Sequence, residues 1–183
     1  MKNMRKIIFS GDSNLPHAHL ALLALTTLAV AALGGCDYTT PLVTKPEIEI
    51  DQSLVGLWQS TKPGGPADKL LVLPLNPREY LVSYPAGKDD AMFGRGCLWR
   101  GAGLTLVQLD WFGTARAVLP EDRRTFQFAA YTVAGGQLSV RLLNADVVKN
   151  DVQTPEELAK AIAAHQDDEA LFREALLFKK IKR

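Results

Sequence analysis

Short apolar runs recur along the chain between Leu54 and Leu143, and residues that form turns separate them. Each run has the length of a β-strand, and Gly, Pro or Asn-Pro lies between neighbouring runs. The runs occupy residues 55–60, 69–73, 79–84, 92–100, 104–112, 125–133 and 137–143. Regularly spaced strands of this length predict an antiparallel β-sandwich or a β-barrel.

The last of these runs gives the clearest local prediction. Leu138, Val140 and Leu142 alternate with polar residues, which indicates a half-buried strand that turns these three side chains to the core. Gly135 and Gly136 precede the strand. Two glycines can adopt the positive φ angles of a type I′ turn, so the sequence predicts a tight hairpin between the runs 125–133 and 137–143.

The run 125–133 is apolar on both faces. Phe126 and Phe128 share one face of a strand, whereas Tyr131 and Val133 share the other. This change of face predicts a β-bulge near residues 129–130, a common feature where a sheet bends into a barrel.

The hydrophobic period changes from two to between three and four after Asn150. Thr154 is a good helix N-cap, a proline follows at the first helical position, and Glu157 completes a capping box. Apolar residues then continue at helical spacing, which predicts a helical segment over 154–175 with its apolar stripe packed against the β-domain. Residues 176–181 fit either the end of this helix or a closing strand.

The first 35 residues have a different pattern. Basic residues at positions 2, 5 and 6 precede Leu20–Leu33, a run of 14 residues without a charge. A helix that spans a bilayer needs about 20 apolar residues, so this run is short for a permanent anchor. A basic start followed by a short apolar core is typical of a secretory signal peptide.

The residues Leu33-Gly34-Gly35-Cys36 follow the apolar core and resemble the lipobox of bacterial lipoproteins. The resemblance implies that 1–35 is a cleaved signal peptide and that Cys36 carries the lipid, normally palmitate among other acyl chains. Two or three chains give a stable membrane anchor. The domain would then lie on the periplasmic or extracellular side of the cell membrane. Asp37 resembles the inner-membrane retention signal of enterobacterial lipoproteins and favours that membrane.

Residues 36–53 contain two prolines and several threonines and have no clear hydrophobic period. This composition predicts a lipidated tether between the membrane and the folded domain. A single domain over 54–183 follows. The chain from Cys36 onward has 148 residues, which is the size of one domain.

Charge and cysteine content exclude two further classes of protein. Three basic residues and one acidic residue precede Cys36, so 18 of the 21 basic and 19 of the 20 acidic residues remain after it. A neutral balance gives no electrostatic footprint for nucleic acid. Cys97 is the single cysteine besides Cys36, so the domain has no internal disulfide.

The triplet Gly56-Leu57-Trp58 lies in the first predicted strand and resembles the G-x-W signature of lipocalins and related calycin barrels. The resemblance implies that Trp58 packs across the closed end of a barrel against a basic residue of the last strand, either Lys179 or Lys180. The predicted fold is therefore mainly β (α+β), a small antiparallel lipocalin-like barrel or sandwich with a C-terminal helical segment.

The sequence predicts no catalytic, cofactor-binding or metal-binding residues. His165 is the one histidine after Cys36, and metal sites need several converging ligands. Cys97 is interpreted as a buried, unreactive thiol. The glycine-rich segments 94–96 and 101–103 lack the further glycine of a dinucleotide fingerprint and are interpreted as bulges or turns.

We therefore expect a non-enzymatic binding or accessory domain that recognises a protein partner or a small apolar ligand. A filled barrel favours the protein partner and an open apolar barrel favours the ligand. The alternative is a periplasmic inhibitor of an envelope hydrolase, which would present the loop 87–90, and a hydrolytic enzyme is less favoured. The candidate structural or ligand-lining residues are aromatic: Trp58, Tyr80, Tyr84, Trp99 and Trp111.

Overall fold

The computed structural model describes residues 37–62, 64–116 and 124–182. The predicted signal peptide, residues 1–35, and the predicted lipidation site Cys36 lie outside the described residues. Both stay predictions from the sequence.

The described residues form eight β-strands, one α-helix and two short 3₁₀ helices. The strands are β1 (Gly56–Ser60), β2 (Lys69–Asn76), β3 (Glu79–Tyr84), β4 (Met92–Gly101), β5 (Leu104–Thr114), β6 (Phe126–Ala134), β7 (Gln137–Leu142) and β8 (Leu176–Lys180). The helices are η2 (Gln52–Leu54), α1 (Pro155–Ala164) and η3 (Glu169–Leu171).

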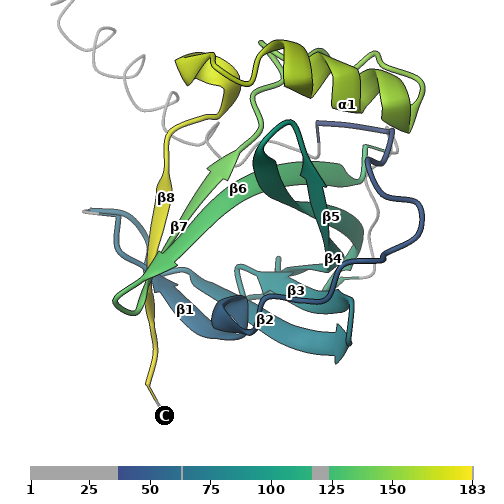
Figure 1. Cartoon of the computed structure of the whole chain (residues 1–183). Helices are drawn as coiled ribbons and strands as arrows, with labels where there is room; N and C mark the ends of the chain where they lie inside the picture. Colours follow the sequence, from purple (N-terminus) through teal and green to yellow (C-terminus); the bar gives the residue numbers. More distant parts are fainter. Residues whose placement is uncertain (1–36, 63, 117–123, 183) are drawn as a thin grey trace, which may run out of the picture. The chain divides into compact units, whose positions relative to one another are not determined.

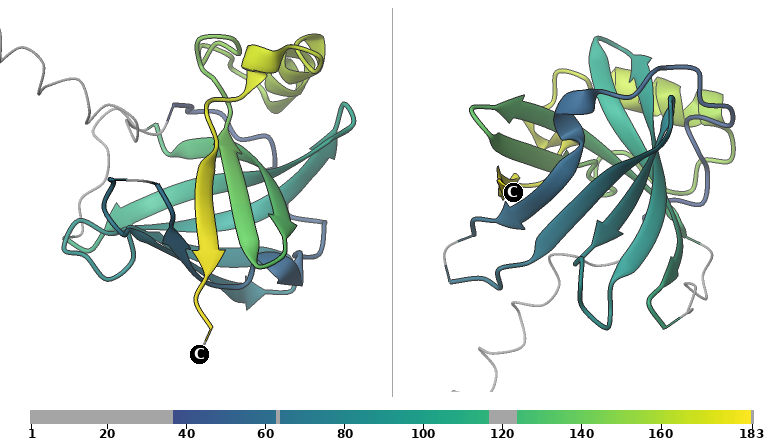
Figure 2. Two further views of the ribbon diagram at one scale, coloured as in Figure 1. Left: turned by 90° about the vertical axis from the view of Figure 1, so that its left-hand side faces the viewer. Right: turned by 90° about the horizontal axis from the view of Figure 1, so that it is seen from below.

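Each strand pairs antiparallel with the next one along the chain, and β8 pairs with β1 to close the barrel (Figure 1; Figure 2). This arrangement confirms the mainly β, lipocalin-like barrel with a C-terminal helical segment and rejects the sandwich. The helical segment is shorter than the predicted 154–175. The capping box forms as expected: Thr154 accepts a hydrogen bond from the Glu157 backbone, and the Glu157 carboxylate accepts one from Thr154 N–H.

The last apolar run is the closing strand β8. Phe178 is buried opposite Leu138 of β7, whereas the neighbouring Leu177 is 54% exposed. This alternation has the period of two that a strand requires. Residues 176–180 are therefore the closing strand and not the end of the helix. Phe178 and Leu138 both face the barrel interior.

One apolar core fills the inside of the barrel. Seven of the eight strands and η2 contribute buried residues to it, which requires a shared inner face. Its buried members are Leu54, Trp58, Val72, Tyr80, Val82, Leu98, Val107, Trp111, Leu138 and Phe178. Val140 packs against this core, as the sequence predicted for the strand that starts at Gln137.

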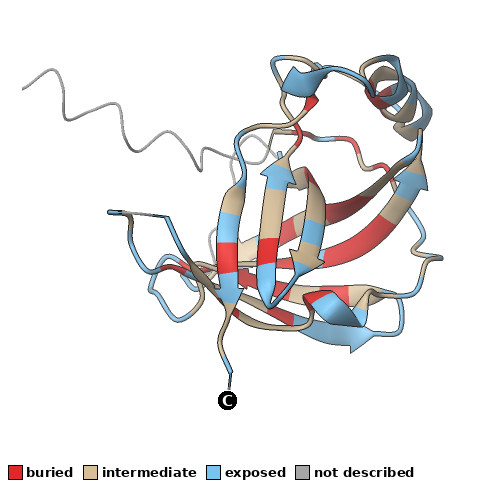
Figure 3. Cartoon of the chain, turned by 60° about the vertical axis from the view of Figure 1, so that its left-hand side comes forward, coloured by how far each residue is buried: buried red, intermediate tan, exposed pale blue. Residues whose placement is uncertain are grey.

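A second apolar core lies on the outside of β5 and β6. Leu106 and Phe128 point outward and are covered by Leu158 and Ile162 of α1, all four at most 1% exposed. Figure 3 shows buried segments (red) along the strands of the barrel and on the helix. The predicted packing of the helix against the barrel is therefore confirmed.

Residues 37–50 are named the strap here. Its first part packs on this outer core through Tyr38, Leu42 and Val43, whereas Ile48 and Ile50 pack against the interior core. Tyr38 is 1% exposed, forms a β-bridge with Phe126 and donates a hydrogen bond from its hydroxyl to Val148 O at 2.7 Å. Asp37 forms an ion pair with Arg173 at 3.2 Å. The described part of the predicted tether over 36–53 is thus bound to the barrel, because the apolar outer face of β5 and β6 binds Tyr38, Leu42 and Val43.

The same outer core explains an error in the prediction for β6. The pairings of β6 with β5 and with β7 are regular, so there is no bulge at residues 129–130. Both faces of β6 are apolar because one faces the interior and the other faces α1 and the strap. The Gly135-Gly136 hairpin is confirmed, with φ angles of 58° and 77°.

Trp58 closes one end of the barrel and is fully buried. Its indole Nε1 donates a hydrogen bond to Leu54 O at 2.8 Å, and Lys180 Nζ lies 4.9 Å from the centroid of its ring. Lys180 also donates to Ser53 O at 3.4 Å. Gly56 has a φ of 146°, and a Cβ there would lie 2.7 Å from Lys180 Cε. The glycine of the G-x-W triplet thus leaves space for the lysine that covers the tryptophan.

Replacing Trp58 with alanine should therefore destabilise the barrel strongly. We expect Trp58→Ala to lower the free energy of unfolding by about 3–5 kcal/mol, because a large buried aromatic leaves a cavity. The matched control is Phe112→Ala, since Phe112 is an aromatic that is 50% exposed. We expect the control to change stability by about 0.5 kcal/mol or less. Urea denaturation followed by circular dichroism measures both, and equal losses would contradict the assigned role of Trp58.

Candidate functional site

The structure divides the five predicted aromatic site residues between the two sides of the barrel wall. Trp58, Tyr80 and Trp111 lie in the interior core, and Tyr84 packs against it at 6.2 Å from the Phe178 ring. Trp99 instead packs against the outer core beneath α1 and the strap. The five residues do not line one common site.

The barrel interior is filled by its own side chains. Trp58, Tyr80 and Trp111 are 0%, 1% and 5% exposed, so almost none of their surface is accessible to water. A Cβ on Gly94 would lie 2.9 Å from Trp111 Cε3, so the indole packs directly on its partner residue in the neighbouring strand β4. A site for a drug-sized apolar ligand needs about 300 Å³ or more, and the residues around these rings leave no such space.

A polar network joins the barrel interior to η2. The Tyr80 hydroxyl accepts a hydrogen bond from Asp51 N–H at 2.6 Å and donates to Asp51 O at 3.2 Å. The Asp51 carboxylate accepts hydrogen bonds from Tyr131 Oη at 3.1 Å and Ser53 N at 2.9 Å. Burial raises the pKa of Tyr80 to about 12 and also raises the pKa of Tyr131. Burial therefore keeps both phenols neutral, and their hydrogen bonds to Asp51 fix η2 over the barrel end.

The carboxylate of Asp51 makes stability depend on pH. Burial by itself would raise its pKa, but the hydrogen bonds from Ser53 and Tyr131 outweigh this effect and hold the pKa below the ordinary 3.8. A carboxyl with a depressed pKa in the folded state stabilises the fold above its unfolded pKa, and this contribution is lost as pH falls through the folded pKa.

We therefore expect Asp51→Asn to reduce the free energy of unfolding at about pH 7 and to have progressively less effect below about pH 4. Denaturant titrations of both proteins across this range measure the difference. Asp89→Asn is the control, because Asp89 lies in the exposed turn between β3 and β4. A difference between wild type and Asp51→Asn that stays constant down to about pH 2 would contradict the inferred hydrogen bonding.

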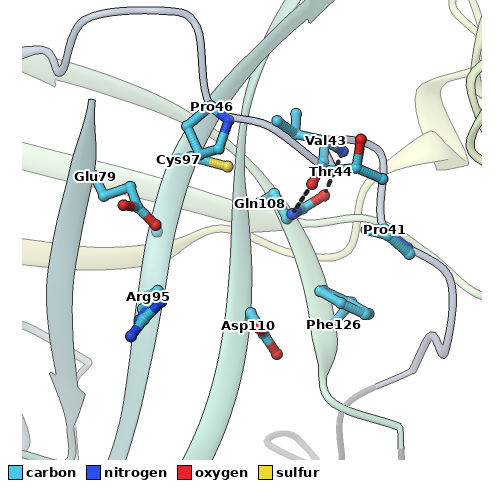
Figure 4. Close-up of a pocket in the computed structure, with 11 residues that line it drawn as sticks. Pro41, Val43, Thr44, Pro46, Glu79, Arg95, Cys97, Gln108, Asp110 and Phe126 are labelled. Atoms are coloured by element: carbon cyan, nitrogen blue, oxygen red, sulfur yellow. Dashed lines mark hydrogen bonds between the residues drawn. The ribbon is translucent and has the colours of Figure 1, made fainter.

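A cleft of about 360 Å³ opens on the outer surface of the barrel, between the strap and strands β3–β6 (Figure 4). Its strap side consists of Pro41, Val43, Thr44 and Pro46. Its barrel side includes Glu79, Arg95, Cys97, Asp110 and Phe126. This cleft is named the strap cleft. A second cleft, of about 170 Å³, lies between β1 and the outer faces of β6–β8, beside Thr132, Ser139 and Leu177.

Gln108 fixes the strap over the cleft. Its side-chain Oε1 accepts hydrogen bonds from Leu42 N at 2.7 Å and Val43 N at 2.8 Å, and its Nε2 donates to Val43 O at 2.9 Å. Gln108 is 5% exposed. A buried amide that satisfies three backbone groups orders the segment it binds, so the strap wall of the cleft is preformed.

Charged side chains occupy the floor of the strap cleft. Arg95 of β4 is exposed and lies directly opposite Asp110 of β5 in the strand pairing. Glu79 comes from β3, the other neighbour of β4 (Figure 4). Among the described residues, no ion pair or hydrogen bond engages the Arg95 side chain or the Asp110 carboxylate. Both signs of charge are therefore available to a bound molecule.

Cys97 lies beside these charges as a buried thiol. Burial raises its pKa to about 11, and the carboxylates of Glu79 and Asp110 add to this effect. The thiolate is the reactive form of cysteine, so the thiol is unreactive near neutral pH, as the sequence analysis expected.

Other polar residues discussed from the sequence lie apart from the cleft. His165 ends α1 and lies 3.8 Å from the Asp168 carboxylate. Lys88, in the loop 87–90 that the inhibitor alternative requires, pairs with Asp68. Within the described residues, no three His, Cys, Asp or Glu side chains converge into a metal-binding group.

Sequence reasoning did not identify the strap cleft or the Asp51 network. One signal was present: Gln108 is a polar residue inside an apolar run, and a strand with two buried faces has no solvent-exposed place for it. The charges at 79, 95 and 110 gave no signal, because alternating charged residues are usual on the outer face of a strand.

Comparison with known proteins gives no family. No model of a known protein family matches the chain, and no curated protein matches it. In the part of the chain that the structure describes, no helix is both long and apolar enough to cross a bilayer.

Proposed function

We propose that this chain is a lipid-anchored accessory protein of the bacterial cell envelope that binds a protein partner through the outside of a filled barrel. The observation that carries the proposal is the packed interior. Trp58, Tyr80 and Trp111 occupy the space in which a lipocalin-like barrel would hold an apolar ligand. Recognition is thereby left to the outer surface.

An exposed apolar surface supports a protein partner. Leu73 and Leu75 of β2 are 37% and 45% exposed, and Leu81 of β3 pairs directly with Leu73. Leu71 points to the same outer side as Leu73, two residues away along the strand. These four residues are named the leucine face. Neighbouring exposed leucines are typical of protein interaction sites.

The anchor rests on the sequence alone. A short apolar core and the lipobox-like Leu33–Cys36 support cleavage and lipidation, and lipid on Cys36 would hold the domain outside the cytoplasm. The buried Tyr38 follows Cys36 by two residues, so an anchored barrel would lie close to the bilayer surface. Two residues of extended chain span at most about 7 Å.

The anchor is tested by replacing the lipidated residue. We expect Cys36→Ser to abolish incorporation of radiolabelled palmitate and to leave a longer, uncleaved precursor on gels. Cys97→Ser serves as the control and should label and mature normally, because Cys97 is a buried thiol outside the signal. Normal palmitate labelling of Cys36→Ser would refute the lipid anchor and leave partner binding to be judged separately.

Partner binding is tested by photo-crosslinking in intact cells. A crosslinking amino acid at Leu75 should capture a defined protein, whereas one at Leu177, which is exposed on β8, should not. The double substitution Leu73→Lys and Leu81→Lys should abolish the capture, and Leu177→Lys should preserve it. Equal capture from positions 75 and 177, or capture that the double substitution leaves intact, would contradict the proposal. An apolar small molecule retained by the purified barrel in native mass spectrometry would support the ligand-carrier alternative instead.

A further inference from the structure

The strap cleft has the size and wall structure of a small-molecule site. Its volume of about 360 Å³ falls at the lower end of the range of ligand pockets, which suits an amino acid or a short peptide. Because Gln108 already holds the strap through three hydrogen bonds, little chain needs to be ordered when a ligand enters. A preformed wall lowers the entropic cost of binding.

The charges on the floor of the cleft are arranged with one cation between two anions. Arg95 on the central strand β4 has Asp110 on one neighbouring strand and Glu79 on the other (Figure 4). The planar guanidinium is well suited to a carboxylate, which it binds through two parallel hydrogen bonds. The carboxylates of Asp110 and Glu79 suit an ammonium group. The cleft thus presents complementary partners for both ends of a zwitterion.

Apolar surfaces lie beside these charges. Val43 and Pro46 line the cleft from the strap, and Phe126 lines it from β6. Figure 4 shows Phe126 on the far side of Asp110 from Arg95. An apolar side chain on a zwitterionic ligand would contact these surfaces while its charged groups meet the floor. Burial of such a side chain adds to affinity in proportion to the apolar area removed from water.

The charge arrangement disfavours simpler ligands. A multiply charged anion such as phosphate would meet the two carboxylates beside Arg95, and a simple cation would meet the guanidinium between them. Like charges repel each other, and this repulsion lowers the affinity of the cleft for phosphate and for a simple cation. An uncharged apolar molecule would leave Arg95 and Asp110 without partners, whereas Glu79 accepts a hydrogen bond from Asn76 at 2.6 Å.

We propose that the strap cleft binds a short zwitterionic peptide with an apolar side chain, its carboxylate on Arg95 and its ammonium group on Asp110. Binding is reversible and involves no covalent step. The cleft lies on β3–β6 and the strap and borders the leucine face, whose Leu81 pairs with Arg95, but the two share no residue, and the cleft needs no lipid. The proposal therefore goes beyond the proposed partner binding and does not depend on it.

The test is a titration of the ¹⁵N-labelled full chain in detergent micelles with the dipeptide Ala-Phe, followed by amide chemical shifts. We expect saturable binding below about 10 mM, with the largest shifts at Gly96, Asp110 and Val43. N-acetyl-Ala-Phe lacks the ammonium group and Ala-Phe amide lacks the carboxylate. Each should bind at least about fivefold more weakly than Ala-Phe, the effect expected for loss of one exposed ion pair.

Two substitutions assign the ends of the ligand. Arg95→Met should weaken binding of Ala-Phe about fivefold or more and remove the preference over Ala-Phe amide. Asp110→Asn should reduce the preference over N-acetyl-Ala-Phe. The matched control Arg78→Met alters an exposed arginine between β2 and β3, outside the cleft, and should leave all three affinities unchanged.

Several outcomes would overturn the proposal. One is the absence of any shift with Ala-Phe at about 10 mM. Others are equal binding of the free and blocked dipeptides, or unchanged binding by Arg95→Met. Shifts confined to residues outside the strap cleft would also refute it. None of these results bears on capture at Leu75, so failure of this site and failure of partner binding are separate findings.

Discussion

The contact between Trp58 and Lys180 joins the first strand of the barrel to the last, and the rest of the fold depends on it. The two residues are direct partners in the pairing of β1 with β8. The lysine covers the indole ring, Gly56 leaves the space for it, and the indole N–H holds η2 through Leu54 O. Trp58 therefore lies where the first strand pairs with the last. Its ring also covers one end of the barrel and fills part of the interior. Loss of this contact would expose the apolar interior and free the edges of β1 and β8.

Filling the interior moves recognition to the outer wall, and there the two halves of the barrel differ. On β5 and β6 the outer face is apolar, but α1 and the strap cover it and form a second core. On β2 the outer face also carries apolar residues, yet no described segment covers the exposed Leu73 and Leu75. At the boundary between the two halves, the strap stands away from the wall and leaves the charged cleft around Arg95. The proposed partner and the proposed peptide thus use separate surfaces.

The strap also changes how a lipid anchor would act. A flexible tether would let the domain move freely above the bilayer, whereas Tyr38 is buried and bonded to the barrel directly after Asp37. On such an anchor, the distance of the barrel from the bilayer and its orientation relative to the bilayer would both be restricted. The leucine face on β2 lies across the barrel from β6, where the strap begins at its bridge to Phe126. If the proposed lipid is attached at Cys36, this geometry would turn that face away from the anchored side.

The sequence by itself determined the local elements: strand periods of two, the Gly135-Gly136 hairpin and the capping box at Thr154 depend on neighbouring residues only. The G-x-W resemblance extended this to closure by Lys179 or Lys180, and the structure selects Lys180. Tertiary structure alone decided that the strap is bound and that Gln108 holds it, because an apolar face on β6 looks the same in sequence whether it packs inward or outward. It also decided the strap cleft, since residues on four separate strands and the strap meet there only after the sheet has formed. Periodicity indicates which residues are buried, but only the register of the closed sheet determines which residues contact one another.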